Sequence, residues 1–186
     1  MTAALDILLE RGFEGTTLES VAESLGYTKP ALYYYFKSKE ELFSSLILNA
    51  LTDSHEKIKS ICSRNNSAGE KLKDLIRLYL DDGVQSRGYF TITHMLKGFK
   101  ERMPEGPDRA EIERLSADIP QLIIGIMRQG IDSGEFRKED PKVLGGIVFA
   151  MLSGVLIHLD MPVLSGADHE RIKSSLDEII VKGITS

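Results

Sequence analysis

Helix start and stop signals follow one another closely over the first 43 residues of this 186-residue chain. Gly12 ends a first segment with helical apolar spacing, because glycine adopts a positive φ without the steric cost of a Cβ atom. Gly26 ends a second segment, and Ser38 with Glu41 has the spacing of a capping box that opens a longer helix. Helices this short are stable only when packed on one another, so the sequence predicts a compact unit of three helices followed by a longer one.

Threonine caps are expected to open the second and third helices. Thr16 has capping-box spacing to Glu19, whereas Thr17 is the better-placed cap if the second helix begins one residue later. Thr28 is the expected cap of the third helix. Pro30 then falls in the first turn, where its missing N–H costs little. The pattern predicts two short helices joined by a tight turn.

The third helix carries the side chains expected to contact DNA. Leu32 and Phe36 lie four residues apart and point toward a shared core, which leaves tyrosines and lysines facing outward. A phenol can donate to a phosphate oxygen while its ring packs on a sugar or a thymine methyl, and lysine neutralises phosphates. Taken alone, the run from Tyr33 to Phe36 is equally compatible with an apolar core that has polar tips. Together with the preceding turn and the flanking lysines, residues 17–36 are typical of a helix-turn-helix that binds duplex DNA.

The same stretch resembles the TetR (tetracycline-repressor) family of bacterial transcription regulators. Residue types agree in order and spacing over about residues 3–47: Gly12-Phe13, Thr16-Thr17, Val21-Ala22, Leu25-Gly26-Tyr27, Leu32-Tyr33-Tyr34-Tyr35-Phe36 and Lys39-Glu40-Glu41-Leu42. Position by position, the resemblance implies base contacts from Lys29, Pro30, Ala31 and Tyr34, and phosphate contacts from Thr17, Tyr33, Tyr35 and Lys39. Thr17 and Thr28 can also present backbone N–H groups to phosphate at helix N-termini.

The rest of the chain is expected to be helical, which gives an all-α fold of about nine helices. A three-helix helix-turn-helix DNA-binding domain would occupy residues 1–43, and a helical effector-binding and dimerisation domain residues 44–186. No β-hairpin signal or sustained period-two alternation appears after residue 39. Pro120 lies inside a long apolar-periodic segment that ends at Gly134, and it should kink that helix or split it near Ala117.

The resemblance further implies that the larger domain binds a small molecule and that the last two helices form a homodimer. Residues on helices expected to surround the effector pocket are Tyr79, Phe90, His94, Met95, Phe99, Met127 and Phe149. Ordinary core packing is the alternative for each of them. The expected dimer-interface residues are Leu144, Val148, Met151, Leu152, Val155, Ile172, Leu176, Ile179 and Ile180. The alternative is that the apolar helix beginning at Val143 is the core of its own subunit.

Composition and motifs argue against several other classes of protein. One cysteine, Cys62, excludes an intramolecular disulfide and fits a reducing cytoplasm. We expect no signal peptide and no membrane-spanning segment, because charges interrupt the apolar runs at the N-terminus and elsewhere. The four histidines lack metal-ligand spacing, and no nucleophile elbow, phosphate loop or dinucleotide-binding glycine pattern is present. We therefore expect no enzymatic activity, no cofactor, no metal and a cytoplasmic location.

The expected function is that of a ligand-responsive transcriptional regulator. A homodimer would bind a palindromic operator in double-stranded DNA, act as a repressor, and leave the operator when a small molecule binds. The alternative is a helical small-molecule-binding or interaction protein that has lost DNA binding. Two observations support that alternative: residues 1–47 hold four basic and seven acidic side chains, and the sequence begins within the first helix, whereas members of the family usually begin with a basic arm.

Overall fold

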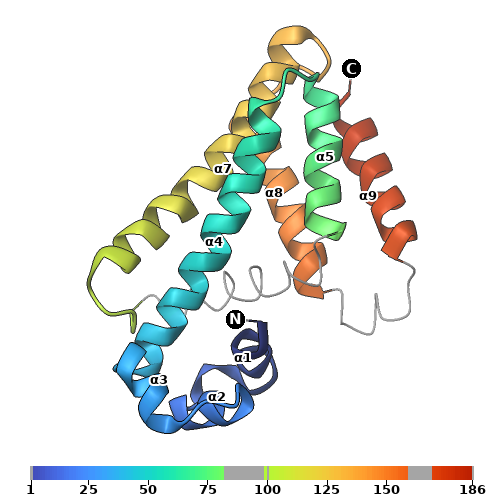
Figure 1. Cartoon of the computed structure of the whole chain (residues 1–186). Coiled ribbons are helices and arrows are strands. Elements are labelled where there is room, and N and C mark those ends of the chain that lie inside the picture. Colours follow the sequence, from blue (N-terminus) through green and yellow to red (C-terminus); the bar gives the residue numbers. More distant parts are fainter. Residues whose placement is uncertain (1, 82–98, 100, 159–168, 186) are drawn as a thin grey trace.

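The protein is all-α in the part of the chain that the computed structural model describes, which is residues 2–81, 99, 101–158 and 169–185. This confirms the expected fold class, a small N-terminal helical unit carrying a helix-turn-helix and a larger helical domain (Figure 1). The eight described helices are α1 (Thr2–Gly15), α2 (Leu18–Ser24), α3 (Lys29–Tyr35), α4 (Lys39–Ser63), α5 (Ala68–Asp81), α7 (Pro107–Ser133), α8 (Pro141–His158) and α9 (His169–Ile184).

The N-terminal unit consists of α1, α2, α3 and the first turns of α4. Gly12 breaks α1 with a φ of 67°, as its position in the sequence predicted. Gly26 ends the turn after α2 with a φ of 69°. Burial of apolar side chains from all four helices stabilises the unit, because none of the three short helices is stable alone. Its buried residues are Ala4, Ile7, Leu18, Val21, Ala22, Leu32, Leu42 and Leu46.

Helix α4 belongs to both parts of the molecule. Leu42 and Leu46 pack in the small N-terminal core, whereas Phe43 and Ile47, one residue further on in each case, pack in the larger core. Consecutive residues on a helix point about 100° apart, so one helix can serve two cores on adjacent faces. The domain boundary between residues 43 and 44 remains a prediction, and any such boundary lies inside a continuous 25-residue helix.

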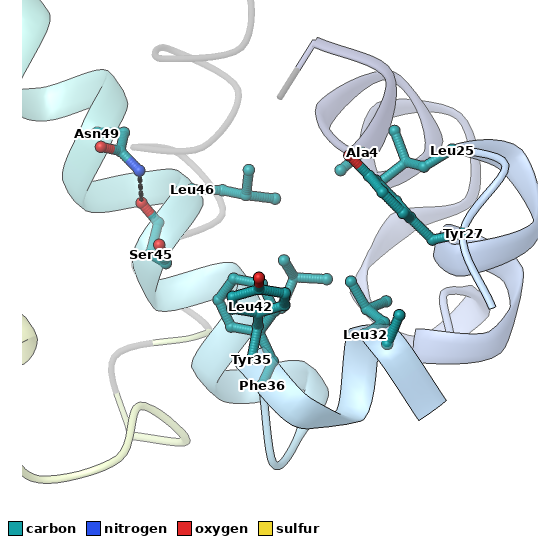
Figure 2. Close-up of a pocket in the computed structure, with 11 residues that line it drawn as sticks. Ala4, Leu25, Tyr27, Leu32, Tyr35, Phe36, Leu42, Ser45, Leu46 and Asn49 are labelled. Atoms are coloured by element: carbon teal, nitrogen blue, oxygen red, sulfur yellow. Dashed lines mark hydrogen bonds between the residues drawn. The ribbon is translucent and has the colours of Figure 1, made fainter. Parts of the chain in front are cut away.

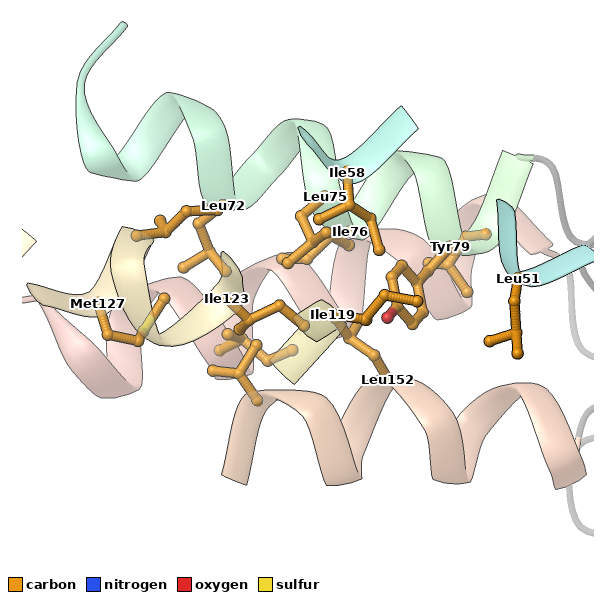
Figure 3. Close-up of a cluster of buried hydrophobic side chains, with 14 of the residues drawn as sticks. Leu51, Ile58, Leu72, Leu75, Ile76, Tyr79, Ile119, Ile123, Met127 and Leu152 are labelled. Atoms are coloured by element: carbon orange, nitrogen blue, oxygen red, sulfur yellow. The ribbon is translucent and has the colours of Figure 1, made fainter. Parts of the chain in front are cut away.

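The larger core is formed between α4, α5, α7, α8 and α9 (Figures 1 and 3). Helix α7 packs against α4 on one side and α8 on the other, and α9 packs against α5. Figure 3 shows side chains of α4, α5, α7 and α8 meeting in the interior, among them Leu51, Leu75, Ile123 and Leu152.

Helix α7 runs through Pro120 without interruption from Pro107 to Ser133, so the expected split near Ala117 is absent. Proline removes one intrahelical hydrogen bond, and the apolar contacts of Ile119 and Ile123 on either side of it hold the helix in the core. The helix ends at Gly134, which has a left-handed φ of 77°. Among the described residues, no helix combines the length and apolar character needed to cross a membrane.

Candidate nucleic-acid interface

Thr17 and Ser20 fix the start of α2 through a reciprocal capping box. The Thr17 hydroxyl accepts a hydrogen bond from the Ser20 backbone N–H, and the Ser20 hydroxyl accepts one from the Thr17 N–H, each at 3.1 Å. The other candidate, a box between Thr16 and Glu19, does not form. Thr16 is fully buried, and its hydroxyl donates to the Gly12 carbonyl at 2.7 Å. The cap leaves the Glu19 side chain, in the first turn of α2, available for contacts with α3.

Helix α3 is attached to the protein by a narrow strip of its surface. Thr28 caps it as predicted, accepting from the Ala31 N–H at 3.4 Å, and Pro30 lies in the first turn. Leu32 is the one fully buried residue of this seven-residue helix. Most of α3 therefore faces solvent.

Tyrosines dominate this exposed surface. Tyr34 and Tyr35 are 83% and 72% exposed, and their rings meet edge to face with centroids 5.2 Å apart. Tyr27 in the preceding turn is 61% exposed. Large exposed aromatic side chains are unusual on the surface of a soluble protein unless they bind something. The predictions did not include Tyr27, although an aromatic residue directly after the helix-ending Gly26 was a signal for it.

Lys29 and Tyr33, both predicted to bind DNA, share one carboxylate partner on α2. The Lys29 ammonium lies 2.6 Å from Oε1 of Glu19, and the Tyr33 hydroxyl donates to the same oxygen at 3.0 Å. These hydrogen bonds, with that of Lys29 the strongest, lower the pKa of Glu19 to about 2. The carboxylate is therefore ionised at physiological pH, and it raises the pKa of Lys29 and of Tyr33.

Lys39 points toward α1. Its ammonium donates to the Phe13 carbonyl oxygen at 3.0 Å, and it lies 4.2 Å from the centroid of the Phe13 ring. Its side chain is 25% exposed. The phosphate contact predicted for Lys39 remains a prediction, and it would compete with these contacts inside the protein.

A cavity of about 460 Å³ lies behind α3, between α1, α3 and α4 (Figure 2). Its lining is mostly apolar, with Leu32 and Phe36 from the α3 side and Leu42 and Leu46 from α4. Tyr35, on the exposed surface, also lines it. The base of α3 therefore borders an open, mostly apolar cavity.

The structure describes four of the seven residues predicted to surround an effector. Tyr79, Phe99 and Met127 are buried in the larger core, and Phe149 packs against it half-buried. Their effector contacts remain predictions, and core packing accounts for their burial. The other three, Phe90, His94 and Met95, lie outside the described residues.

The predicted dimer-interface residues fall on two different faces. Five of them are buried within the chain itself: Leu144, Val148, Leu152, Leu176 and Ile180. Of the other four, Ile179 is 60% exposed and Met151, Val155 and Ile172 are partly buried. The interface contacts of all nine stay predictions, because helical spacing identifies an apolar face without saying which partner covers it.

Two residues of α8 that the predictions did not include are also exposed and apolar. Val143 and Ile147 are each about half exposed, and they lie one helical turn apart. The exposed positions Gly146 and Ala150 continue this face with small residues. We call Val143, Ile147 and Ile179 the exposed apolar residues of α8 and α9.

Comparison with known proteins agrees with this architecture over both parts of the chain. Residues 1–46 match the family described as bacterial regulatory proteins of the tetR family, and residues 65–157 match the tetracyclin repressor-like C-terminal domain. The transcriptional regulator RutR of Escherichia coli K12 is 34% identical over 156 residues, which cover 81% of this chain and 68% of RutR.

Two solved structures show the same fold at lower identity. The ketosteroid transcriptional regulator KstR2 of Mycobacterium tuberculosis has a TM-score of 0.81 at 20% identity, over 99% of this chain and 92% of that one. AibR, solved with isovaleryl coenzyme A and operator DNA, has a TM-score of 0.75 at 19% identity, over 96% of this chain and 94% of that one. With both family domains matched in their expected order, the chain belongs to the TetR family of bacterial transcriptional regulators.

Proposed function

We propose that the exposed surface of α3 is the operator-binding surface of a homodimeric repressor that a small molecule releases. The observation that carries the proposal is the position of Tyr34 and Tyr35 on a helix that a single buried leucine anchors. A short helix presented in this way fits the major groove, where tyrosine rings contact sugars and thymine methyl groups and hydroxyls contact phosphates. Lys29 at the N-terminal end of α3 supplies the positive charge.

Dimerisation would allow the operator-binding surfaces of two subunits to contact two half-sites along the DNA. Helix-turn-helix dimers bind two half-sites separated by about 34–36 Å, one turn of the duplex. The exposed apolar residues of α8 and α9 support an interface formed by these helices, since burying them against a second copy removes apolar surface from water. A two-fold axis there would place two copies of α3 on one side of the dimer and would match a palindromic operator.

The larger domain would respond to the effector. Its core is continuous from α4 to α9, and α4 carries the contacts of that core directly into the N-terminal unit. A ligand shifts the equilibrium between two half-site spacings only by its difference in affinity for the two states. AibR was solved with an acyl coenzyme A, so acyl coenzyme A thioesters are the first ligand class to test. Such a regulator would act in the cytoplasm, where the chromosome lies.

Binding to duplex DNA at increasing salt tests the proposal. The wild-type protein should bind random duplex weakly, with an affinity that falls steeply as salt rises, and it should enrich a palindrome from a randomised pool. Tyr34→Ala and Lys29→Gln should each weaken operator binding about tenfold or more, the scale of one good base or phosphate contact. Arg64→Gln is the matched control, because Arg64 is also exposed and ion-paired but lies at the far end of α4.

The alternative, a protein that has lost DNA binding, gives the opposite result. A wild-type protein that binds no duplex at low salt and enriches no sequence would favour a helical small-molecule-binding or interaction protein. The wild type could bind an operator that Tyr34→Ala and Lys29→Gln bind with the same affinity as the wild type. In that case the operator-binding surface lies elsewhere on the molecule.

A further inference from the structure

Glu19 occupies an unexpected place for an acidic residue, on the surface proposed to meet DNA. Its Oε1 accepts from the Lys29 ammonium at 2.6 Å and from the Tyr33 hydroxyl at 3.0 Å. The same ammonium lies 5.7 Å from the centroid of the Tyr33 ring, so the three side chains form one cluster between α2 and α3. Two of the predicted DNA contacts are therefore oriented by one carboxylate.

The cluster is open to solvent and therefore to DNA. The side chains of Lys29 and Glu19 are 61% and 43% exposed. An exposed ion pair contributes little to folding stability, which leaves the arrangement without a strong structural reason. The fixed negative charge bears directly on any polyanion that approaches α3.

Backbone phosphates offer only acceptors and negative charge, so Glu19 opposes binding that relies on them. It repels the phosphates and competes with them for Lys29. Two unit charges 4 Å apart interact by roughly 1 kcal/mol in water and more near a protein surface. Random DNA is bound almost entirely through its phosphates, so the repulsion from Glu19 lowers its affinity with no compensating contact.

A base edge in the major groove can offset this penalty. Cytosine presents its N4 amino group there, and a carboxylate accepts a hydrogen bond from it. Lys29 and Tyr33 hold the Glu19 carboxylate in one position before DNA arrives, so little side-chain freedom would be lost when that hydrogen bond forms. A half-site with cytosine at this position would then recover the binding free energy that a random sequence loses through repulsion between Glu19 and the phosphates.

We propose that Glu19 is a specificity-determining residue, which lowers affinity for DNA in general and selects an amino-bearing base, cytosine, in the operator half-site. This inference rests on the proposed function, since it requires that α3 is the helix that contacts the operator bases. Through its hold on Lys29, Glu19 also acts as a positioning residue.

Glu19→Gln in the full-length protein tests the inference, with Glu23→Gln as the matched control. Both substitutions remove one negative charge from α2, and Glu23 is exposed one helical turn further along. Binding to a random duplex of about 30 base pairs is measured against salt, and sequences are selected from a randomised duplex pool. Glu19→Gln should bind random duplex about three- to tenfold more tightly, the effect of roughly 1 kcal/mol. Its salt dependence should also be steeper by about one phosphate contact.

The selected sequences provide the second measurement. Glu19→Gln should lose a cytosine preference at one position of each half-site, whereas Glu23→Gln should keep it. In a protein that already carries Lys29→Gln, adding Glu19→Gln should raise the affinity for random duplex by less. The reason is that Lys29 is no longer present to be freed from its ion pair with Glu19. Circular dichroism confirms that each variant is folded before binding is compared.

The outcomes separate the two proposals. If the wild type selects an operator but Glu19→Gln matches Glu23→Gln in random-duplex affinity and in selected sequence, the role of Glu19 is refuted while the repressor function stands. A wild type that binds no DNA overturns both.

Discussion

Arg102, just before α7, forms an ion pair with Glu14 at the end of α1. The pair lies over an aromatic cluster in which Phe13 meets Phe43 and Phe99, each with ring centroids 4.9 Å apart. The end of α1, the start of α4 and the segment before α7 are thereby joined at one place. At this junction the larger domain contacts the N-terminal unit through side chains, in addition to the continuity of α4.

The aromatic contact should stabilise this junction far more than the ion pair does. Phe99→Ala should lower the free energy of unfolding by about 3 kcal/mol, because it removes a buried ring. Arg102→Ala should cost less than about 1 kcal/mol, since both charged side chains are largely exposed. Urea unfolding followed by circular dichroism measures both changes. A larger loss for Arg102→Ala than for Phe99→Ala would show that charge holds the junction.

The exposed apolar residues of α8 and α9 should hold the dimer together. Ile147→Glu and Ile179→Glu should each shift the protein toward monomers, because a charge buried in an apolar interface loses its hydration. Sedimentation velocity over a range of protein concentrations measures the shift. Thr52→Glu, at an exposed position of α4, is the control and should leave the dimer intact. Dimers that persist in both isoleucine variants would place the interface on another surface.

Gly145 should be intolerant of any side chain because α7 and α8 approach closely there. A Cβ atom at Gly145 would lie 2.8 Å from Cγ1 and 3.2 Å from Cα of Ile124. Gly145→Ala should therefore destabilise the protein by about 1–3 kcal/mol. Gly125→Ala is the matched comparison: it lies next to Ile124 on α7, it has open space around it, and it should stabilise the helix by about 0.5–1 kcal/mol. Thermal unfolding distinguishes the two, and equal effects would refute the close approach.

Glu135 caps the start of α5, and its carboxylate should make the free energy of unfolding depend on pH. Its carboxylate accepts from the backbone N–H groups of Gly69 at 3.0 Å and Ala68 at 3.3 Å, and these bonds, led by that of Gly69, lower its pKa below 4.5. A carboxyl group whose pKa is lower in the folded state than in the unfolded one stabilises the fold fully above its unfolded pKa. That stabilisation is lost as the pH falls through the folded pKa.

Glu135→Gln should accordingly lower stability at pH 7 by roughly 1 kcal/mol, the scale of a lost helix cap. The difference between the two proteins should shrink as the pH falls from the unfolded-state value of 4.5 through the lower folded pKa, below which the wild-type carboxyl group is neutral as well. Midpoints of urea unfolding between pH 3 and 7 measure this. A constant difference across the range would mean that the charge of Glu135 plays no part.

Local signals in the sequence predicted the N-terminal unit well. Gly12 and Gly26 end their helices with positive φ, and Thr17, Thr28 and Ser38 cap the helices that follow. Each of these features depends on a few neighbouring residues and on steric rules that act within them. The box between Thr16 and Glu19 does not form, because Thr16 is buried and its hydroxyl donates to the Gly12 carbonyl four residues earlier.

Apolar periodicity showed which residues avoid water but not what covers them. Leu152 and Leu176 have the spacing expected of interface residues, and both pack in the core of their own chain. Ile147 has the same character but faces outward. Periodicity is a property of one helix, whereas the choice of partner depends on how five helices pack together.

The order of residue types by itself determined the all-α class, the helix-turn-helix and the place of its caps, because these follow from interactions within a few residues. Only the tertiary structure decided which charges and aromatic rings meet. Glu19 and Lys29 are ten residues apart on different helices, and the packing of α2 against α3 brings them within 2.6 Å. Glu14 and Arg102 are 88 residues apart and meet because the larger domain packs against the end of α1. Side-chain pairs of this kind depend on the relative placement of whole helices, which short-range sequence patterns do not encode.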